Sequence, residues 1–239
     1  MAASVRPERP GGGPALRPRG RTGGDPPGAH GRLAALLAHD LKTPLAAIAM
    51  NIEFVLSELS RDAAAAPLCA ALDDCRSANA RAIAILSDMA DAARLEAGDL
   101  CVKLTRVQVA RLFGALVRRF EGDAHSRGVV MTSRIGIDAV RTDEGLLSRV
   151  LGRLLERAVR HARPGSTIWL ESEEATLTVR VSPPADEKDV VPIHDVFRGL
   201  AMQFAETVTR ALGGEVVTDA SEDGSLSVQL TLAEATVTP

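Results

Sequence analysis

The segment His39-Asp40-Leu41-Lys42-Thr43-Pro44-Leu45 lies early in a stretch whose apolar residues recur every three, four or seven positions. That spacing predicts one long helix with a single buried stripe, made by Leu33, Leu37, Leu41, Ile48, Ile52, Val55 and Leu59. His39 lies off the stripe, so we expect its imidazole to reach solvent. Pro44 has no N–H to donate to the carbonyl of Asp40, so the sequence predicts a helix kink at Pro44, one turn after the histidine–acid pair.

Two long helices with a short link between them are expected in this part of the chain. The first covers about residues 31–60. The second begins near Pro67, which suits the first turn of a helix, and stops at Gly98. It carries a second set of apolar residues at helical spacing, namely Leu68, Leu72, Cys75, Ala82, Ile85, Leu86, Met89 and Leu95. A hairpin buries little by itself, so we expect two copies to pair as a four-helix bundle.

Beyond Gly98 the hydrophobic period changes. We expect strands at residues 100–107, 129–137, 167–171, 176–181, 216–219 and 226–232, and helices at 109–120, 144–162 and 199–212. This mixture predicts an α/β sandwich, in which helices cover one face of a mixed sheet. The expected fold class is therefore an antiparallel helical hairpin that forms a dimeric four-helix bundle, followed by an α/β sandwich.

Composition argues against several classes of function. The formal net charge is −3, aromatic residues are few and tyrosine is absent, which disfavours a nucleic-acid-binding surface. No apolar run reaches the length of a membrane span, and residues 1–30, rich in Pro, Gly and Arg, predict a flexible tail rather than a signal peptide. Cys69, Cys75 and Cys101 lack the spacing of a zinc site or a disulfide framework. We therefore expect a cytoplasmic protein with reduced thiols and no metal, membrane or nucleic-acid partner.

The segment that ends at Leu45 resembles the phospho-accepting box of bacterial sensor histidine kinases, which reads His, acid, two residues, Thr or Asn, Pro, Leu. Every defining position matches, at His39, Asp40, Thr43, Pro44 and Leu45. Residues 94–98 (Arg-Leu-Glu-Ala-Gly) resemble the exit from the dimerisation domain of these kinases, and the order of elements that follows resembles their ATP-binding domain. The resemblance covers roughly residues 31–233 and implies a tail at 1–30, a dimerisation and phosphotransfer hairpin at 31–98 and a degenerate ATP-binding domain at 99–239.

The resemblance implies a role for each polar residue of the box. His39 would be phosphorylated, because a neutral imidazole nitrogen can attack phosphorus, and Asp40 would hold the ring and stabilise its developing positive charge. Thr43, four residues from His39 on the same helical face, would orient the water that removes phosphate from a receiver. The implied partners are the receiver domain of a response regulator, a second copy of the chain and, upstream, a hybrid histidine kinase.

The expected ATP site departs from the family pattern. The family carries two asparagines, one of them a magnesium ligand, where this chain has Arg153 and Arg157. Arginine offers only hydrogen-bond donors and a positive charge, so it cannot ligate a cation. The adenine-reading aspartate falls at Pro183, the nucleotide lid shortens to about residues 186–198, and the second glycine motif survives only at Gly199. We therefore expect no cofactor, because Mg-ATP binding is lost, although the two arginines could instead bind a triphosphate directly.

Three functions remain open from the sequence. The first is a phosphorelay protein, a histidine phosphotransferase whose His39 exchanges a phosphoryl group with receiver aspartates. The second is a pseudokinase that binds or dephosphorylates a response regulator or binds a partner kinase, and the third is an active cytoplasmic sensor histidine kinase. Intact Asp40 and Thr43 favour the first two over a pure scaffold, which needs neither residue. The altered ATP site disfavours the third.

Overall fold

The computed structural model describes residues 29–59, 65–184, 197, 199–221 and 223–232, and for residues 29–40, 44 and 58 it describes the backbone alone. The expected tail at 1–30 therefore lies almost wholly outside the described residues. So does the shortened lid at 186–198, except for Phe197, which is buried in the core of the sheet domain.

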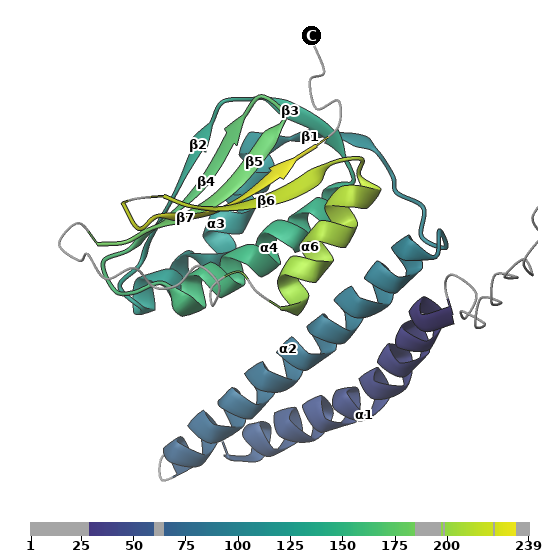
Figure 1. Cartoon of the computed structure of the whole chain (residues 1–239). Helices are drawn as coiled ribbons and strands as arrows, with labels where there is room; N and C mark the ends of the chain where they lie inside the picture. Colours follow the sequence, from purple (N-terminus) through teal and green to yellow (C-terminus); the bar gives the residue numbers. More distant parts are fainter. Residues whose placement is uncertain (1–28, 60–64, 185–196, 198, 222, 233–239) are drawn as a thin grey trace, which may run out of the picture.

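Two long helices form the hairpin (Figure 1). Helix α1 spans Ala29–Leu59 and α2 spans Ala66–Glu96. Helix α1 is continuous through Pro44 and is bent in Figure 1, as expected for a helix that contains a proline. Helix α2 has Pro67 in its first turn and ends just before Gly98, whose φ of 75° lets the chain turn away from the helix. The predicted helices and their ends are confirmed.

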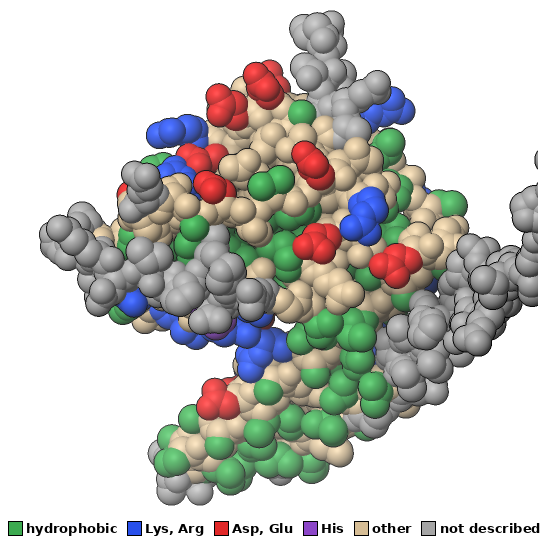
Figure 2. All heavy atoms as spheres, in the orientation of Figure 1, with side chains coloured by type: hydrophobic (Ala, Val, Ile, Leu, Met, Phe, Trp, Pro, Cys, Tyr) green, Lys and Arg blue, Asp and Glu red, His purple; other side chains and the backbone are tan. Residues whose placement is uncertain are grey.

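The hairpin buries few side chains in a single chain. Within its described residues only Ile52, Asn79, Asp88 and Ala93 are buried. Large apolar side chains of the same helices are instead exposed, namely Leu41, Ile48, Met50, Phe54, Val55, Leu68, Ile85 and Met89. Hydrophobic side chains accordingly cover much of the hairpin in Figure 2. None of the helices in the described ranges is long and apolar enough to cross a membrane.

A five-stranded mixed sheet follows the hairpin. Its strand order is β2 (Val130–Ile135), β4 (Thr167–Glu173), β5 (Thr176–Ser182), β7 (Leu226–Thr231) and β6 (Glu215–Ala220). Strands β2 and β4 are parallel and the other pairs are antiparallel, including the closing hairpin β6–β7. The expected sheet and its two hairpins are confirmed.

A separate two-stranded sheet corrects one part of the prediction. Strand β1 covers only Thr105–Gln108 rather than residues 100–107, and its partner β3, at Ala139–Thr142, was not expected. Residues 100–104 have no neighbouring strand, and the amide of Lys103 donates instead to Oδ2 of Asp143 at 2.9 Å. Strand β3 is four residues long, which is too short for a period-two pattern to stand out.

Three helices pack on one face of the larger sheet, as Figure 1 shows: α3 (Val109–Ser126), α4 (Glu144–His161) and α6 (Leu200–Ala211). Alternate residues of β4 and β5 point into the core, and those of α4 face them from across the layer. Fully buried examples include Ile168, Leu170, Leu177, Leu151 and Leu155. Each such side chain stabilises the fold by about 1.5–3 kcal/mol relative to an exposed one. The predicted helical hairpin followed by an α/β sandwich is confirmed.

Asp143 fixes the start of α4 relative to the hairpin. Its Oδ1 accepts a hydrogen bond from the amide of Leu146 at 3.0 Å and so caps the helix, while its Oδ2 holds the amide of Lys103 in the connection from α2. The apolar face of α4 packs against the sheet, and Arg149 and Arg153 reach α2 from the other side of the helix.

Candidate functional site

The structure places the predicted phospho-acceptor residues in the middle of α1. His39, Asp40, Thr43 and Pro44 all lie within this helix, and positions 39 and 43 are one turn apart on one face. The side chain of Thr43 is exposed. Because the structure describes only the backbone at His39, Asp40 and Pro44, their roles in the reaction stay predictions.

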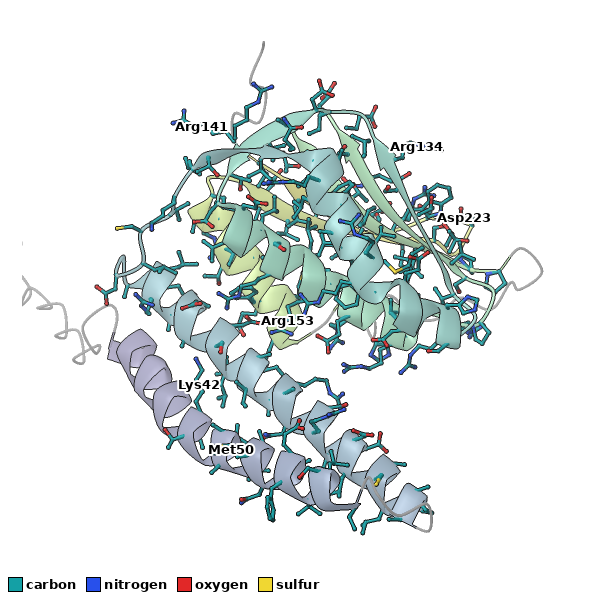
Figure 3. All side chains as sticks on the ribbon, turned by 180° about the vertical axis from the view of Figure 1, so that it is seen from behind. Lys42, Met50, Arg134, Arg141, Arg153 and Asp223 are labelled. Carbon is teal, nitrogen blue, oxygen red and sulfur yellow. The ribbon has the colours of Figure 1, made fainter. Side chains whose placement is uncertain are left out.

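Two large apolar side chains continue the face that carries positions 39 and 43. Met50 and Phe54 follow Thr43 by seven and eleven residues, which returns them to nearly the same side of the helix. Their side chains are 73% and 66% exposed, the highest values among the exposed large hydrophobic residues. Figure 3 marks the position of Met50 on α1. We call Thr43, Met50 and Phe54 the acceptor face.

A cluster of charges joins α4 to α2. Arg153 donates from Nε to Oδ2 of Asp88 at 2.6 Å, and Arg149 donates to Oδ1 of Asp88 at 2.7 Å and to Oδ2 of Asp91 at 2.5 Å. The Asp88 side chain is only 8% exposed. Figure 3 shows Arg153 between the sheet domain and α2. We call these four residues the interhelix ion cluster. Breaking a buried pair of this kind strongly destabilises a protein, because it leaves a charge without compensation.

Helix α6 completes the same interface. The guanidinium of Arg149 lies 5.1 Å from the ring centroid of Phe204, and the hydroxyl of Thr207 donates to Oε1 of Glu96 at 3.4 Å. Burial works to lower the pKa of Arg149, but the hydrogen bonds and negative charges of Asp91 and Asp88 outweigh it and raise the pKa. Arg149 therefore stays charged within the interface.

The structure brings the predicted ATP-site arginines together with the start of α6. A cavity of about 190 Å³ is lined by Arg153 and Arg157 from α4, by Leu200 and Ala201 from α6, and by Arg81 from α2. Its charged lining is completed by Arg160 and Glu156. Figure 2 shows basic side chains at this junction between the sheet domain and the hairpin.

The lining of this cavity does not fit a magnesium nucleotide. Among the described residues that line it, Glu156 is the only carboxylate, and it already pairs with Arg153 at 3.1 Å and with Arg160 at 2.8 Å. The remaining charged groups are guanidiniums, which repel a cation and offer it no lone pair. Throughout the described part of the chain, no three His, Cys, Asp or Glu side chains gather as a metal site.

Pro183 and Gly199, the other two residues predicted in the altered ATP site, occupy different surroundings. Pro183 follows β5 directly and does not line the cavity. Gly199 precedes α6, and its carbonyl accepts the amides of Met202 and Gln203 at 3.0 and 3.1 Å. Its φ of 87° is a conformation that only glycine adopts readily, so this glycine has a structural use in starting the helix.

Sequence reasoning missed the residues on α2 that contact the sheet domain. Asp88 and Asp91 were not singled out, nor was their partner Arg149. A signal was present, because Asp88 lies between Leu86 and Met89, two apolar residues of the second helix. Its partners, however, lie about sixty residues away in the sequence, and no local pattern pairs them.

Residues 29–98 match the family model of the His Kinase A (phospho-acceptor) domain. The sensor protein CzcS of Cupriavidus metallidurans is 29% identical over 193 residues, which cover 78% of this chain and 40% of the relative. The sensor protein DivL of Caulobacter vibrioides is 28% identical over 165 residues, which cover 66% of this chain and 20% of the relative. The chain thus matches less than half the length of either relative.

Two solved structures share the fold at low identity. Full-length ShkA, solved in complex with AMPPNP, aligns with a TM-score of 0.59 at 19% identity, and the alignment covers 85% of this chain and 47% of ShkA. The histidine kinase AdeS of Acinetobacter baumannii aligns with a TM-score of 0.58 at 15% identity. That alignment covers 82% of this chain and 98% of the AdeS chain. Residues 29–98 thus match a phospho-acceptor domain, and the chain is similar to two-component sensor histidine kinases in sequence and shares their fold.

Proposed function

We propose that this chain is a phosphorelay protein: His39 accepts a phosphoryl group from the aspartate of one receiver domain and donates it to another, without Mg-ATP. The observation that carries the proposal is the contact of Arg153 with the buried carboxylate of Asp88. One of the two positions where the family carries asparagines here holds a cation that joins two helices.

The chemistry needs no nucleotide. The unprotonated imidazole nitrogen of His39 attacks the phosphorus of a receiver acyl phosphate, a new N–P bond forms, and the P–O bond to the receiver carboxylate breaks. The carboxylate leaves with the electron pair, and Asp40 stabilises the positive charge that develops on the ring. The reverse sequence loads the next receiver. No step changes the oxidation state of any group.

The loss of Mg-ATP binding rests on the donor set of the cavity between α2, α4 and α6. Four arginines and one engaged carboxylate line it. Direct binding of a triphosphate by the arginines remains as an alternative, since guanidinium groups pair well with phosphate. It would still lack the adenine-reading aspartate that Pro183 replaces.

The acceptor face supports docking of a receiver on α1. Met50 and Phe54 are large, exposed and on the side of the helix that carries positions 39 and 43. Exposed apolar side chains gathered beside a reactive group are typical of a protein–protein contact. The proposed partner is a receiver domain with a complementary apolar surface.

A different set of apolar residues supports a homodimer. Leu41, Ile48 and Val55 are exposed on α1 at intervals of seven residues, and Leu68 and Cys75 repeat that interval on α2. A seven-residue apolar repeat is typical of helices that pack along a shared seam. Two hairpins joined along these stripes would form a four-helix bundle and leave the acceptor face free.

Thr43 supports a second candidate function. Its side chain is exposed one turn from His39, where a hydroxyl could orient water against a receiver phosphate. The chain would then be a regulator that dephosphorylates or sequesters a response regulator. An active kinase is the least favoured alternative, because of Arg153. In either favoured case we propose a cytoplasmic protein.

One experiment separates these functions. The full chain is incubated either with radiolabelled ATP and magnesium, or with receiver domains of response regulators that carry labelled phosphate from acetyl phosphate. A phosphorelay protein becomes labelled only from the receivers, and His39→Ala abolishes the label. A phosphatase removes label from the receiver without gaining it. Labelling from ATP alone would refute the proposal in favour of a kinase.

A further inference from the structure

Asn79 is the one polar residue of α2 that is buried against α1 in the described part of the hairpin. Its side chain is 7% exposed, and its Nδ2 donates a hydrogen bond of 2.7 Å to the main-chain carbonyl of Leu45. Leu72 and Leu86 lie seven residues to either side, so Asn79 interrupts an apolar row that faces α1.

The other end of the amide has no partner. Oδ1 of Asn79 is buried and makes no hydrogen bond to any described residue. A buried acceptor without a partner costs more free energy than one neutral hydrogen bond returns. A leucine, which has the same branching of heavy atoms although it is larger, would continue the row without that cost. The asparagine is therefore poorly explained by stability.

The position of the bond suggests what Asn79 does instead. Leu45 follows Pro44, whose missing N–H weakens the helix at this point. The carbonyl of Leu45 has two lone pairs, so it can accept the amide of Asn79 as well as an intrahelical bond. The contact thus ties α1 to α2 immediately after the proline, six residues beyond His39.

We propose that Asn79 is a positioning residue: its hydrogen bond to Leu45 fixes the proline-containing segment of α1 and thereby the direction in which the phospho-acceptor turn faces a receiver. A polar residue inside a helical bundle that fixes register at a cost in stability is a known device. The inference rests on the proposed phosphotransfer for its catalytic consequence, but not for its structural part.

The test compares the full chain with its Asn79→Leu variant in three measurements. The melting temperature is expected to rise by about 2–4 °C, because the unpaired acceptor is gone. Amide hydrogen exchange is expected to become faster in residues 41–50, where the tie to α2 is lost. Phosphotransfer from a labelled receiver is expected to fall by about tenfold or more, because the reacting groups are misaligned. If Asn79 were merely structural, replacing it would not both raise the melting temperature and lower the rate of phosphotransfer.

Ile52→Val is the matched control, since it removes one buried methyl group from the same interface. It is expected to lower the melting temperature, to speed exchange evenly along the hairpin and to leave the transfer rate unchanged. If leucine fits poorly and lowers the melting temperature, hydrogen exchange is measured on the Asn79→Ala variant instead, and its pattern decides whether Asn79 has the positioning role. Faster exchange confined to residues 41–50 supports the inference.

Exchange that is unchanged or slower in residues 41–50, or equally faster over both helices, would overturn the role of Asn79. Failure of the wild-type chain to accept phosphate from any receiver would instead overturn the proposed function. The exchange measurement still decides the positioning role in that event, so the two failures are distinguishable.

Discussion

Arg153 of α4 donates from Nε to Oδ2 of Asp88 on α2 at 2.6 Å, across the boundary between the sheet domain and the helical hairpin. Arg149, one turn earlier in α4, donates to the other oxygen of the Asp88 carboxylate. Arg153, one of the two arginines expected where the family carries its paired asparagines, therefore has a structural partner of its own. The contact ties the sheet domain to the hairpin, whereas a kinase must bring a bound nucleotide to its histidine.

Asp88→Asn is expected to destabilise the full chain by about 3 kcal/mol, because two guanidiniums lose their shared counter-charge in a largely buried interface. Urea unfolding measures the loss, and small-angle scattering should detect a larger radius of gyration as α4 separates from α2. Glu144→Gln is the matched control: it removes the exposed pair with Arg111 and should cost at most about 0.5 kcal/mol. A change of similar size in both variants would contradict the role given to the ion cluster.

The ion cluster is expected to persist in alkaline solution. The pKa of Arg149 is raised in the folded state, so its stabilising effect is fully present below its unfolded-state pKa and is lost only as pH rises through the folded value. The stability difference between wild type and Asp88→Asn should therefore be constant between roughly pH 7 and 10. A difference that shrinks across this interval would show that a group other than Arg149 provides the positive charge.

Local patterns predicted most of the fold because most of its elements are long enough to show their hydrophobic period and their end residues in the sequence. The stripes of α1 and α2, Pro67 at the start of α2 and Gly98 after its end fix the hairpin. The strand alternation of β4 and β5 likewise predicts their faces. Strand β3 was not predicted, because its four residues are too few to show a period-two alternation.

The candidate site was only partly predictable, for a different reason. The acceptor box lies in one short segment, and sequence spacing alone places His39 and Thr43 on one face of α1. The use of Arg153 depends on Asp88, which is 65 residues away. Charge type at a single position showed what Arg153 cannot bind, but only the packing of α4 on α2 shows what it does bind.

Millimolar Mg-ATP is expected to leave the melting temperature of the full chain unchanged, because the described residues that line the cavity beside Arg157 offer no available carboxylate or amide for the metal. A ligand present at a hundred times its dissociation constant would add about 2.7 kcal/mol, which shifts the melting temperature by several degrees. Thermal unfolding with ATP alone serves as the comparison. A rise that needs magnesium would restore the kinase alternative, whereas a rise with ATP alone would support direct phosphate binding by arginine.

Ile48→Arg is expected to convert the proposed homodimer to a monomer, because it places a charge in the seven-residue stripe of α1. Sedimentation velocity measures the change in mass. Met50→Arg, two residues further along the same helix but on the acceptor face, is the matched control and should remain dimeric. Dissociation by both variants or by neither would mean that the stripe is not the dimer seam.

Met50→Arg and Phe54→Ala are expected to weaken receiver binding by about tenfold each, since both remove exposed apolar surface beside the acceptor turn. Calorimetric titration with the receiver that transfers phosphate best gives the affinity. Val217→Ala, which shortens an exposed apolar side chain on β6 of the sheet domain, is the control and should bind as wild type. Normal binding by the two acceptor-face variants would mean that the receiver docks on another surface of the protein.

Thr43→Ala tests whether the chain also removes phosphate. If the exposed Thr43 hydroxyl orients water, its loss should slow the disappearance of receiver phosphate by about 10²-fold, while receiver binding and phosphorylation of His39 persist. Thr43→Asn is the informative control, because the amide can still hold a water, and asparagine also occurs at this position of the box. Retained hydrolysis in Thr43→Asn but not in Thr43→Ala would support a phosphatase role beside the relay. Equal rates in all three chains would mean that Thr43 takes no part in hydrolysis and that phosphate leaves only by transfer through His39.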